Sequence, residues 1–340
     1  MKNQILLSLL AAGILLAGCS KSENEGGEGP VHGDGQLVAI RLSSGIWDAA
    51  KAGSKAPVTA EAPATVQIEG WESSTGAADY TAATSDWQST ASVKVLTQEE
   101  IGADETANDI TLSPVQYYNA DENIKTYIKG WYPAAKSANG KVTFSAAEDA
   151  DKGYDYAGDG TDDVLLSNEV SGGKKEAEQI SKALVFDHVT TQLVFKVKKG
   201  EGLAEGTKIK TIKLKGGKIP GGIDLSSGTV TFTAPTEDDG KLDTKVEVAE
   251  ITTEATQAGV ALMVEETSDN DALTLFIETT TDDGTTVAAT YDNVKIKPST
   301  GTGFKKGTAY SIEMTFKQSG IVLEANITPW TEATGEGEVI

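Results

Sequence analysis

Apolar and polar side chains alternate with a period of two over much of the chain after residue 36, and this pattern restricts the fold more than any other feature. Between residues 310 and 317 every second residue is apolar, and the same spacing returns between residues 321 and 327. Such alternation is typical of a β-strand with one buried face. The polar segment 318–320 separates the two rows, which predicts a C-terminal hairpin whose second strand presents Ile321, Leu323, Ala325 and Ile327 on one face.

Short strands of this type recur along the chain, and glycine, proline and Asp-Asp-Gly clusters separate them. The other strand candidates are residues 37–42, 65–71, 92–96, 123–131, 141–144, 193–198, 208–215, 229–233, 245–251, 258–264 and 273–277. Only residues 174–183 have a helical pattern, with one turn expected at 98–103. Many short strands between turn signals indicate β-sandwiches. We therefore predict an all-β chain with two tandem Greek-key β-sandwich domains, residues 36–175 and 176–340.

The first eighteen residues have the organisation of a bacterial signal peptide. Lys2 gives a positive start, and residues 5–17 form an apolar stretch that is too short for a permanent membrane helix. The stretch ends in Leu16-Ala17-Gly18-Cys19, which resembles the lipobox of bacterial lipoproteins, where cleavage precedes a lipid-carrying cysteine. We expect residues 1–18 to be removed and the lipid on Cys19 to anchor the chain in the outer membrane. Because Cys19 is the only cysteine, no disulfide can form within the chain.

Residues 19–35 are predicted to be a lipidated, flexible tether. Residues 20–30 are rich in glycine and glutamate and contain no apolar side chain, so the segment cannot bury enough surface to offset the entropy of ordering. Acidic residues so close to the lipidated cysteine resemble the surface-export signal of Bacteroidota lipoproteins. A solvated linker without a targeting role is the alternative interpretation.

Composition excludes several classes of function. The chain has 51 acidic and 29 basic side chains and a formal charge of −22, which argues against nucleic-acid binding. With two histidines and one cysteine, little remains for nucleophilic or zinc chemistry, and no G-x-S-x-G stretch lies on a strand-to-helix turn. We interpret His188 as a packed, hydrogen-bonded residue. The acidic run 155–163 lacks the spacing of an EF-hand and is interpreted as a turn-forming loop rather than a calcium site. We expect no enzyme activity, no cofactor and no metal.

Five segments, in order, resemble recurring stretches of the fimbrillin-like (Mfa-like) surface lipoproteins of Bacteroidota. They are Gly130-Trp131-Tyr132-Pro133, Asp163-Val164-Leu165-Leu166-Ser167, the run FDHVTTQLVFKV from Phe186 to Val197, FKKGTAY from Phe304 to Tyr310, and IVLEANITPW from Ile321 to Trp330. The resemblance implies a pair of transthyretin-like β-sandwiches. It also implies a structural or adhesive subunit of surface fimbriae, as stalk, anchor or tip, with other fimbrial subunits as partners.

The same resemblance implies a mode of assembly. Proteolysis after an arginine removes an N-terminal strand, and a strand from the next subunit fills the vacated groove. The chain has one arginine, Arg41, inside the candidate strand 37–42, where Val38, Ile40 and Leu42 are expected to face the core. An outward-facing arginine on an uncut surface strand is the alternative interpretation, and an anchor subunit that keeps its lipid would need Arg41 uncut. The strand 321–327 is the candidate donor.

A surface lipoprotein that captures glycans without forming a filament is the second functional hypothesis. Exposed aromatic side chains would bind host or bacterial surface glycans by ring stacking. The candidates for that role are Trp47, Trp71, Trp87 and Tyr118. The alternative interpretation is that they are core or turn residues, which is the commoner role of Trp and Tyr in strands. The sequence does not identify a receptor, a glycan or a partner subunit.

Overall fold

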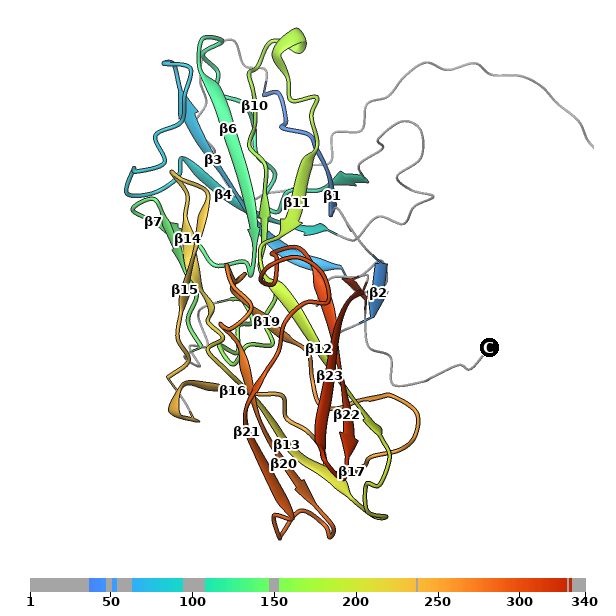
Figure 1. Cartoon of the computed structure of the whole chain (residues 1–340). Helices are drawn as coiled ribbons and strands as arrows, with labels where there is room; N and C mark the ends of the chain where they lie inside the picture. Colours follow the sequence, from blue (N-terminus) through green and yellow to red (C-terminus); the bar gives the residue numbers. More distant parts are fainter. Residues whose placement is uncertain are drawn as a thin grey trace, which may run out of the picture. The chain divides into compact units, whose positions relative to one another are not determined.

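The computed structural model describes residues 37–46, 51–53, 63–93, 108–146, 153–236, 238–328 and 330–331, and the regular secondary structure within these ranges is almost all β-strand (Figure 1). The predicted all-β class is confirmed. Within these ranges the helical segments are two 3-10 turns, η1 (Glu176–Glu178) and η2 (Asp238–Gly240). The leader, the tether and the turn expected at 98–103 lie outside the described residues.

The helix predicted for residues 174–183 is wrong, since only η1 takes a helical turn there. The main-chain N–H of Ile180 donates to the hydroxyl of Tyr118 (2.9 Å) rather than to a helical carbonyl. The side chain of Ile180 packs against the core, and the N–H of Gly173 donates to the carbonyl of Glu178 (2.9 Å). Tertiary contacts therefore hold the segment as a loop.

The first sheet contains eight strands in the order β4-β3-β6-β9-β11-β1-β5, with β10 paired to β6. The long strand β3 pairs antiparallel with β4 and β6, whereas β1 runs parallel to β11 and antiparallel to β5. The strands are β1 (Leu42–Ile46), β3 (Ala64–Ser73), β4 (Trp87–Val93), β5 (Asn108–Ile110), β6 (Lys125–Tyr132), β9 (Leu165–Ser167), β10 (Val170–Gly172) and β11 (Leu184–His188).

Both faces of the first sheet carry buried side chains. One face holds a cluster that includes Ile40, Ile68 and Phe186. The other contributes Trp71 and Trp131 to a second cluster, shared with a four-stranded sheet in the order β15-β14-β8-β7. We call the latter the hairpin sheet; its strands are β7 (Ser137–Ala138), β8 (Lys141–Thr143), β14 (Ile219–Asp224) and β15 (Thr229–Thr233).

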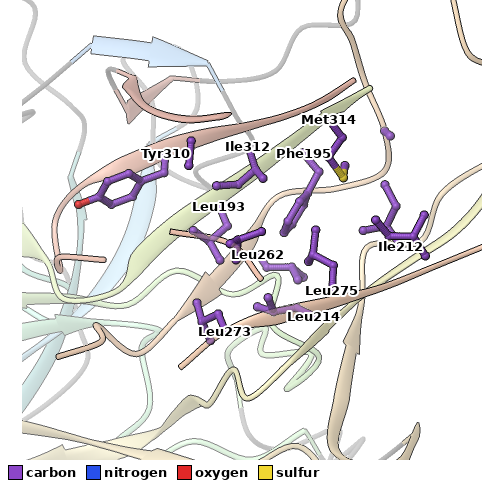
Figure 2. Packing of buried hydrophobic residues seen from close by; sticks show 14 of the residues in the cluster. Leu193, Phe195, Ile212, Leu214, Leu262, Leu273, Leu275, Tyr310, Ile312 and Met314 are labelled. Carbon is purple, nitrogen blue, oxygen red and sulfur yellow. The ribbon is translucent and has the colours of Figure 1, made fainter. Parts of the chain in front are cut away.

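Ten further strands form a sandwich of two five-stranded sheets around the largest core cluster (Figure 2). One sheet has the order β18-β12-β22-β23 with β19 on β12, and the other has the order β16-β13-β20-β21 with β17 on β13. The first sheet of this pair contains β12 (Thr191–Lys199), β18 (Thr256–Gln257), β19 (Leu262–Val264), β22 (Ala309–Lys317) and β23 (Gly320–Thr328). The second contains β13 (Lys208–Lys215), β16 (Lys241–Asp243), β17 (Ala249–Glu250), β20 (Thr274–Thr280) and β21 (Ala289–Lys295).

Alternation in the sequence explains this packing. In Figure 2, Leu193 and Phe195 of β12 lie with Tyr310, Ile312 and Met314 of the neighbouring β22, as expected for residues two apart on one face of a sheet. They face Ile212 and Leu214 of β13 and Leu273 and Leu275 across the sandwich. The polar residues between them, such as Lys196 and Glu313, fall on the other face.

Strand pairing does not follow the predicted division at residue 175. The strand β11 belongs to the first sheet, where it pairs with β9 and β1. The hairpin β14–β15 comes later in the chain but pairs through β14 with β8. A small sheet joins β2 (Lys51–Gly53) in parallel with β24 (Trp330–Thr331). The division into two domains at 175/176 remains a prediction.

Candidate functional site

The segment that precedes β1 is held against the body of the protein by both main chain and side chains. Ala39 forms an antiparallel bridge with Tyr117, the N–H of Ile40 donates to the carbonyl of Gln116 (2.8 Å), and the N–H of Tyr118 donates to the carbonyl of Val38 (3.0 Å). Ile40 is buried, and Val38 is partly buried against the same cluster. The alternation expected for residues 37–42 is therefore present.

Arg41 lies between two stretches of paired backbone. The bridge at Ala39 precedes it and β1, which begins at Leu42, follows it, so the expected strand 37–42 is in fact a short bridge and the start of β1. The side chain of Arg41 is exposed, on the same face as Leu37. A protease would find the side chain accessible, but the main chain on both sides would have to open first.

A cut after Arg41 would release a short segment and leave β1 in place. The released residues include Ile40, which is 5% exposed and fills a position in the core. The main-chain carbonyl of Gln116 and the N–H of Tyr118 would lose their partners. The vacated site is thus a narrow apolar groove beside residues 116–118, with a donor and an acceptor along one wall.

The candidate donor strand is β23, and it lies at the edge of its sheet. It pairs in register with β22 over nine residues, from Gly320 opposite Lys317 to Thr328 opposite Ala309. Ala325 is buried, and Ile321 and Leu323 pack against the core, whereas Val322 is 48% exposed. The side chain of Ile327 lies outside the described residues. The alternation predicted from the sequence is present at the three described positions.

The outer edge of β23 offers main-chain groups for pairing. The carbonyl of Ala325 accepts the N–H of Ser299 (2.7 Å), which shows that the odd-numbered residues of β23 direct their peptide groups away from β22. Among the described residues, Ser299 alone donates a main-chain hydrogen bond to this edge. The peptide groups of Ile321 and Leu323 therefore face outward.

Arg41 and β23 belong to different sheets, and the structure does not bring them together. An early and a late segment of the described residues do meet at one place, because Lys51 of β2 pairs with Trp330 of β24, directly beyond β23. Cys19, the expected lipidation site, lies outside the described residues.

His188 is held in a buried polar cluster. Its Nδ1 lies 2.6 Å from Oδ2 of Asp163, and the other oxygen of Asp163 accepts hydrogen bonds from the hydroxyl of Thr190 (3.0 Å) and the N–H of Val164 (2.8 Å). Both ring and carboxylate are buried, at the point where β11 leads into β12. The interpretation of His188 as a packed, hydrogen-bonded residue is confirmed.

The carboxylates of the acidic run 155–163 take part in turns. Asp162 accepts the N–H groups of Ala157 (2.8 Å) and Gly158 (2.7 Å). Asp159 accepts hydrogen bonds from the main chain and hydroxyl of Thr161 and forms an ion pair with Lys245. Burial raises the pKa of Asp159, but the hydrogen bonds from Lys245 and Thr161 outweigh it, so the pKa is lowered overall.

Among the described residues, the aromatic side chains proposed for glycan stacking are not exposed platforms. Trp71 is buried and packs edge-on against Tyr80 with 4.8 Å between ring centroids. Tyr118 is buried beneath the N-terminal segment, and Trp87 is partly buried against the same core. Trp47 lies outside the described residues. For Trp71 and Tyr118 the interpretation as core residues is confirmed, because both fill the two cores beside the first sheet.

An exposed apolar patch near Arg41 was not foreseen. Tyr117 is 42% exposed and Val115 is 51% exposed, and both lie on the segment that pairs with residues 38–40. The bridge places Tyr117 opposite Ala39, two residues before Arg41. The sequence gives only a weak indication of this patch. Residues 115–118 have no clear alternation of apolar and polar side chains, because Pro114 precedes them and Tyr117 and Tyr118 are adjacent.

The fold was compared with those of known proteins. Among the described residues, no helix is long and apolar enough to cross a membrane. A crystal structure of a candidate cell adhesion protein from Bacteroides uniformis is similar at a TM-score of 0.50, with 16% identity over 87% of this chain and 99% of that one. A fimbrial protein from Bacteroides vulgatus gives a TM-score of 0.47, with 15% identity over 86% of this chain and 99% of the other.

A fimbrial assembly protein from Parabacteroides distasonis gives a TM-score of 0.41, with 11% identity, and covers 88% of this chain and 100% of its own. No curated protein matches the sequence. The Fimbrillin-like family matches residues 58–330, which include most of the strands described above. The chain therefore belongs to the Fimbrillin-like family.

Proposed function

We propose that this protein is a structural or adhesive subunit of cell-surface fimbriae that joins its neighbours by β-strand addition, and not an enzyme. Membership of the Fimbrillin-like family and the fimbrial and adhesion descriptions of its structural neighbours support a surface role. The lipid on Cys19 anchors the chain in the outer membrane and other fimbrial subunits are its partners. Antibody labelling of surface filaments distinguishes whether it is a stalk, anchor or tip subunit.

The observation that carries the proposal is the edge strand β23. Its inward side chains alternate, so the strand could fill an apolar groove as well as its own sheet, and its outward peptide groups are available for pairing. The groove that a cut after Arg41 would open has the matching chemistry, an apolar pocket left by Ile40 with unpaired groups at Gln116 and Tyr118. Strand addition needs a donor strand and an acceptor groove, and we propose β23 and the site vacated by Ile40 for these two parts.

Electron microscopy of surface filaments with antibody against this protein tests the proposed function. Label along the shaft identifies a stalk subunit, and label at one end identifies a tip or an anchor. Intact filaments that carry no label would contradict the fimbrial proposal. Retardation of the protein in affinity gels that contain polysaccharides would then favour glycan capture.

Processing and anchoring are tested with two single substitutions. In cells that cut the protein, N-terminal sequencing of sheared material is expected to start at Leu42, and Arg41→Ala is expected to leave only the longer form. Arg41→Lys is the matched control, because it keeps the positive charge and would block only an arginine-specific protease. Cys19→Ser is expected to release the chain from the membrane fraction or to stall its processing. A Cys19→Ser chain that still loses its leader and yet stays in the outer-membrane fraction at the wild-type level would exclude the lipid anchor.

Assembly through β23 is tested by comparing two adjacent positions. Leu323→Asn places a polar group on the inward face, whereas Val322→Asn changes only the exposed face of the same strand. If both variants still fold, as judged by circular dichroism, Leu323→Asn is expected to lower filament number while Val322→Asn is not. Normal filaments from a folded Leu323→Asn variant would exclude β23 as the donor strand.

A further inference from the structure

The edge of the hairpin sheet at β15 (Thr229–Thr233) has no partner strand. Among the described residues, β15 pairs only with β14 and ends the order β15-β14-β8-β7 (Figure 1, yellow). An unpaired edge presents a row of N–H and C=O groups that can pair with another chain. This edge belongs to a different sheet from β23 and from the segment around Arg41.

The hydrogen bonds of β14 show which groups of β15 face outward. The N–H of Leu225 donates to the carbonyl of Gly140 (2.9 Å), and the N–H of Phe144 donates to the carbonyl of Gly221 (3.0 Å), so the odd-numbered residues of this region point toward β8. By alternation, Gly222 and Asp224 point toward β15, where they face Thr231 and Thr229. The peptide groups of Val230 and Phe232 therefore point away from the sheet.

The strand β15 also lacks the features that protect other edges of this protein. Its sequence, Thr-Val-Thr-Phe-Thr, has high β-propensity and no charge. By contrast, the edge strand β21 carries Asp292 and Lys295 and is interrupted by Asn293 at a φ of 56°. The edge strand β4 is covered, because Thr90 bridges to Ser113. Charges and irregularities are the usual protection of an edge, and β15 has neither.

The sequence of β15 is symmetric about Thr231. If two copies pair antiparallel with Thr231 opposite Thr231, then Val230 lies opposite Phe232 and Thr229 lies opposite Thr233. The outward peptide groups of Val230 and Phe232 would meet in hydrogen-bonded pairs, with four N–H···O bonds in all. Val–Phe and Thr–Thr are favourable cross-strand pairs, and no charged residue of β15 brings two acidic chains into repulsion. A two-fold contact of this kind is self-complementary.

We infer that β15 is a lateral contact between two copies of this protein, which join their hairpin sheets into one continuous sheet across a two-fold axis. The contact is separate from the head-to-tail joining of subunits through β23. A five-residue edge buries much less than the roughly 1,000 Å² of a stable interface, so the pair is weak in dilute solution. Copies held close together by a common anchor or filament would gain from their high local concentration.

Disulfide trapping tests the register directly. In a Cys19→Ser background an introduced cysteine is the only thiol of the chain. Thr231 would face its own copy in a non-hydrogen-bonded pair with Cα atoms about 4.5 Å apart, which suits a disulfide. Thr229 is exposed on the same face of the same strand, but the two Thr229 Cα atoms would lie about 13 Å apart. Under mild oxidation, Thr231→Cys is expected to form at least tenfold more dimer than Thr229→Cys on a non-reducing gel.

Mixing and charge variants complete the test. Thr229→Cys mixed with Thr233→Cys is expected to form the mixed dimer, because these residues face each other in the same register. Thr231→Lys is expected to abolish association measured by sedimentation at high protein concentration, with an unchanged melting temperature. Thr229→Lys, the matched control, is expected to reduce it less. Equal cross-linking of Thr231→Cys and Thr229→Cys, or association that survives Thr231→Lys, would overturn the inference.

Discussion

Replacing Ile40 with alanine measures how strongly the segment before Arg41 is held in the core. The side chain of Ile40 is 5% exposed and packs in the cluster on one face of the first sheet. Substitution of a buried isoleucine by alanine costs about 2–5 kcal/mol, and a position so close to the chain's first bridge should relax enough to fall in the lower half of that range. We expect the free energy of unfolding to fall by about 2–3 kcal/mol. Leu37→Ala is the control, since Leu37 is 63% exposed and should change stability by less than about 0.5 kcal/mol.

The assay is urea unfolding followed by circular dichroism, with the midpoint compared at a constant slope so that the shift reports stability. The same reasoning extends to a chain cut at its single arginine with an arginine-specific protease. That cut removes the Ile40 contact, the partial burial of Val38 and two main-chain hydrogen bonds worth about 0.5–1.5 kcal/mol each. The terms for Ile40 and the two hydrogen bonds sum to about 3–6 kcal/mol, which is smaller than the stability of many domains, so the cut chain is expected to remain folded but weakened. An Ile40→Ala variant as stable as the parent, or a cut chain as stable as the intact one, would refute the claim that residues 38–40 fill an apolar groove and stabilise the fold.

Three further perturbations test the packing around this region. Gly130→Ala is expected to lower stability by about 1–3 kcal/mol in urea, because a Cβ there would lie 2.8 Å from Cζ of the buried Phe186 ring. Asp163→Ala is expected to cost about 3–5 kcal/mol, since it leaves His188 and two other buried donors without their acceptor; Asp163→Asn, which keeps one acceptor oxygen, should cost less. Hydrogen bonds from Ser226 and Ser227 lower the pKa of Asp224 to about 2, so its stabilising effect is present above about pH 4 and is lost as the pH falls from about 4 to 2. In Asp224→Ala the melting temperature is therefore expected to depend less on pH over that interval. A pH dependence equal to that of the parent protein would contradict the assignment.

Features that depend on neighbours in the sequence were predicted well. The strands at residues 208–215 and 229–233 have the bounds of β13 and β15, and the C-terminal hairpin is present as β22 and β23. The reason is that alternation is a local property: residues two apart lie on one face of any strand, whatever the strand pairs with. For the same reason alternation alone predicts that Ile40 points inward and Arg41 outward, and both side chains lie that way.

Strands without alternation were missed. The strand β14 contains Pro220, Gly221 and Gly222, which are signals for a turn. The structure gives the reason for one glycine: a Cβ on Gly222 would lie 2.2 Å from the carbonyl oxygen of Val142 on the neighbouring β8. The residue that argues against a strand in the sequence is the residue that lets two strands approach.

Local periodicity and short motifs are enough to establish the all-β class, the faces of the strands and the family. They leave open which distant segments meet, and tertiary packing alone settles that β14 pairs with β8, that Asp163 bonds His188 and that Trp71 and Tyr118 are buried. Those outcomes depend on the free energy of burying surfaces that are far apart along the chain. A strand with one apolar face can be buried equally well against several partners, so its own residues do not select among them.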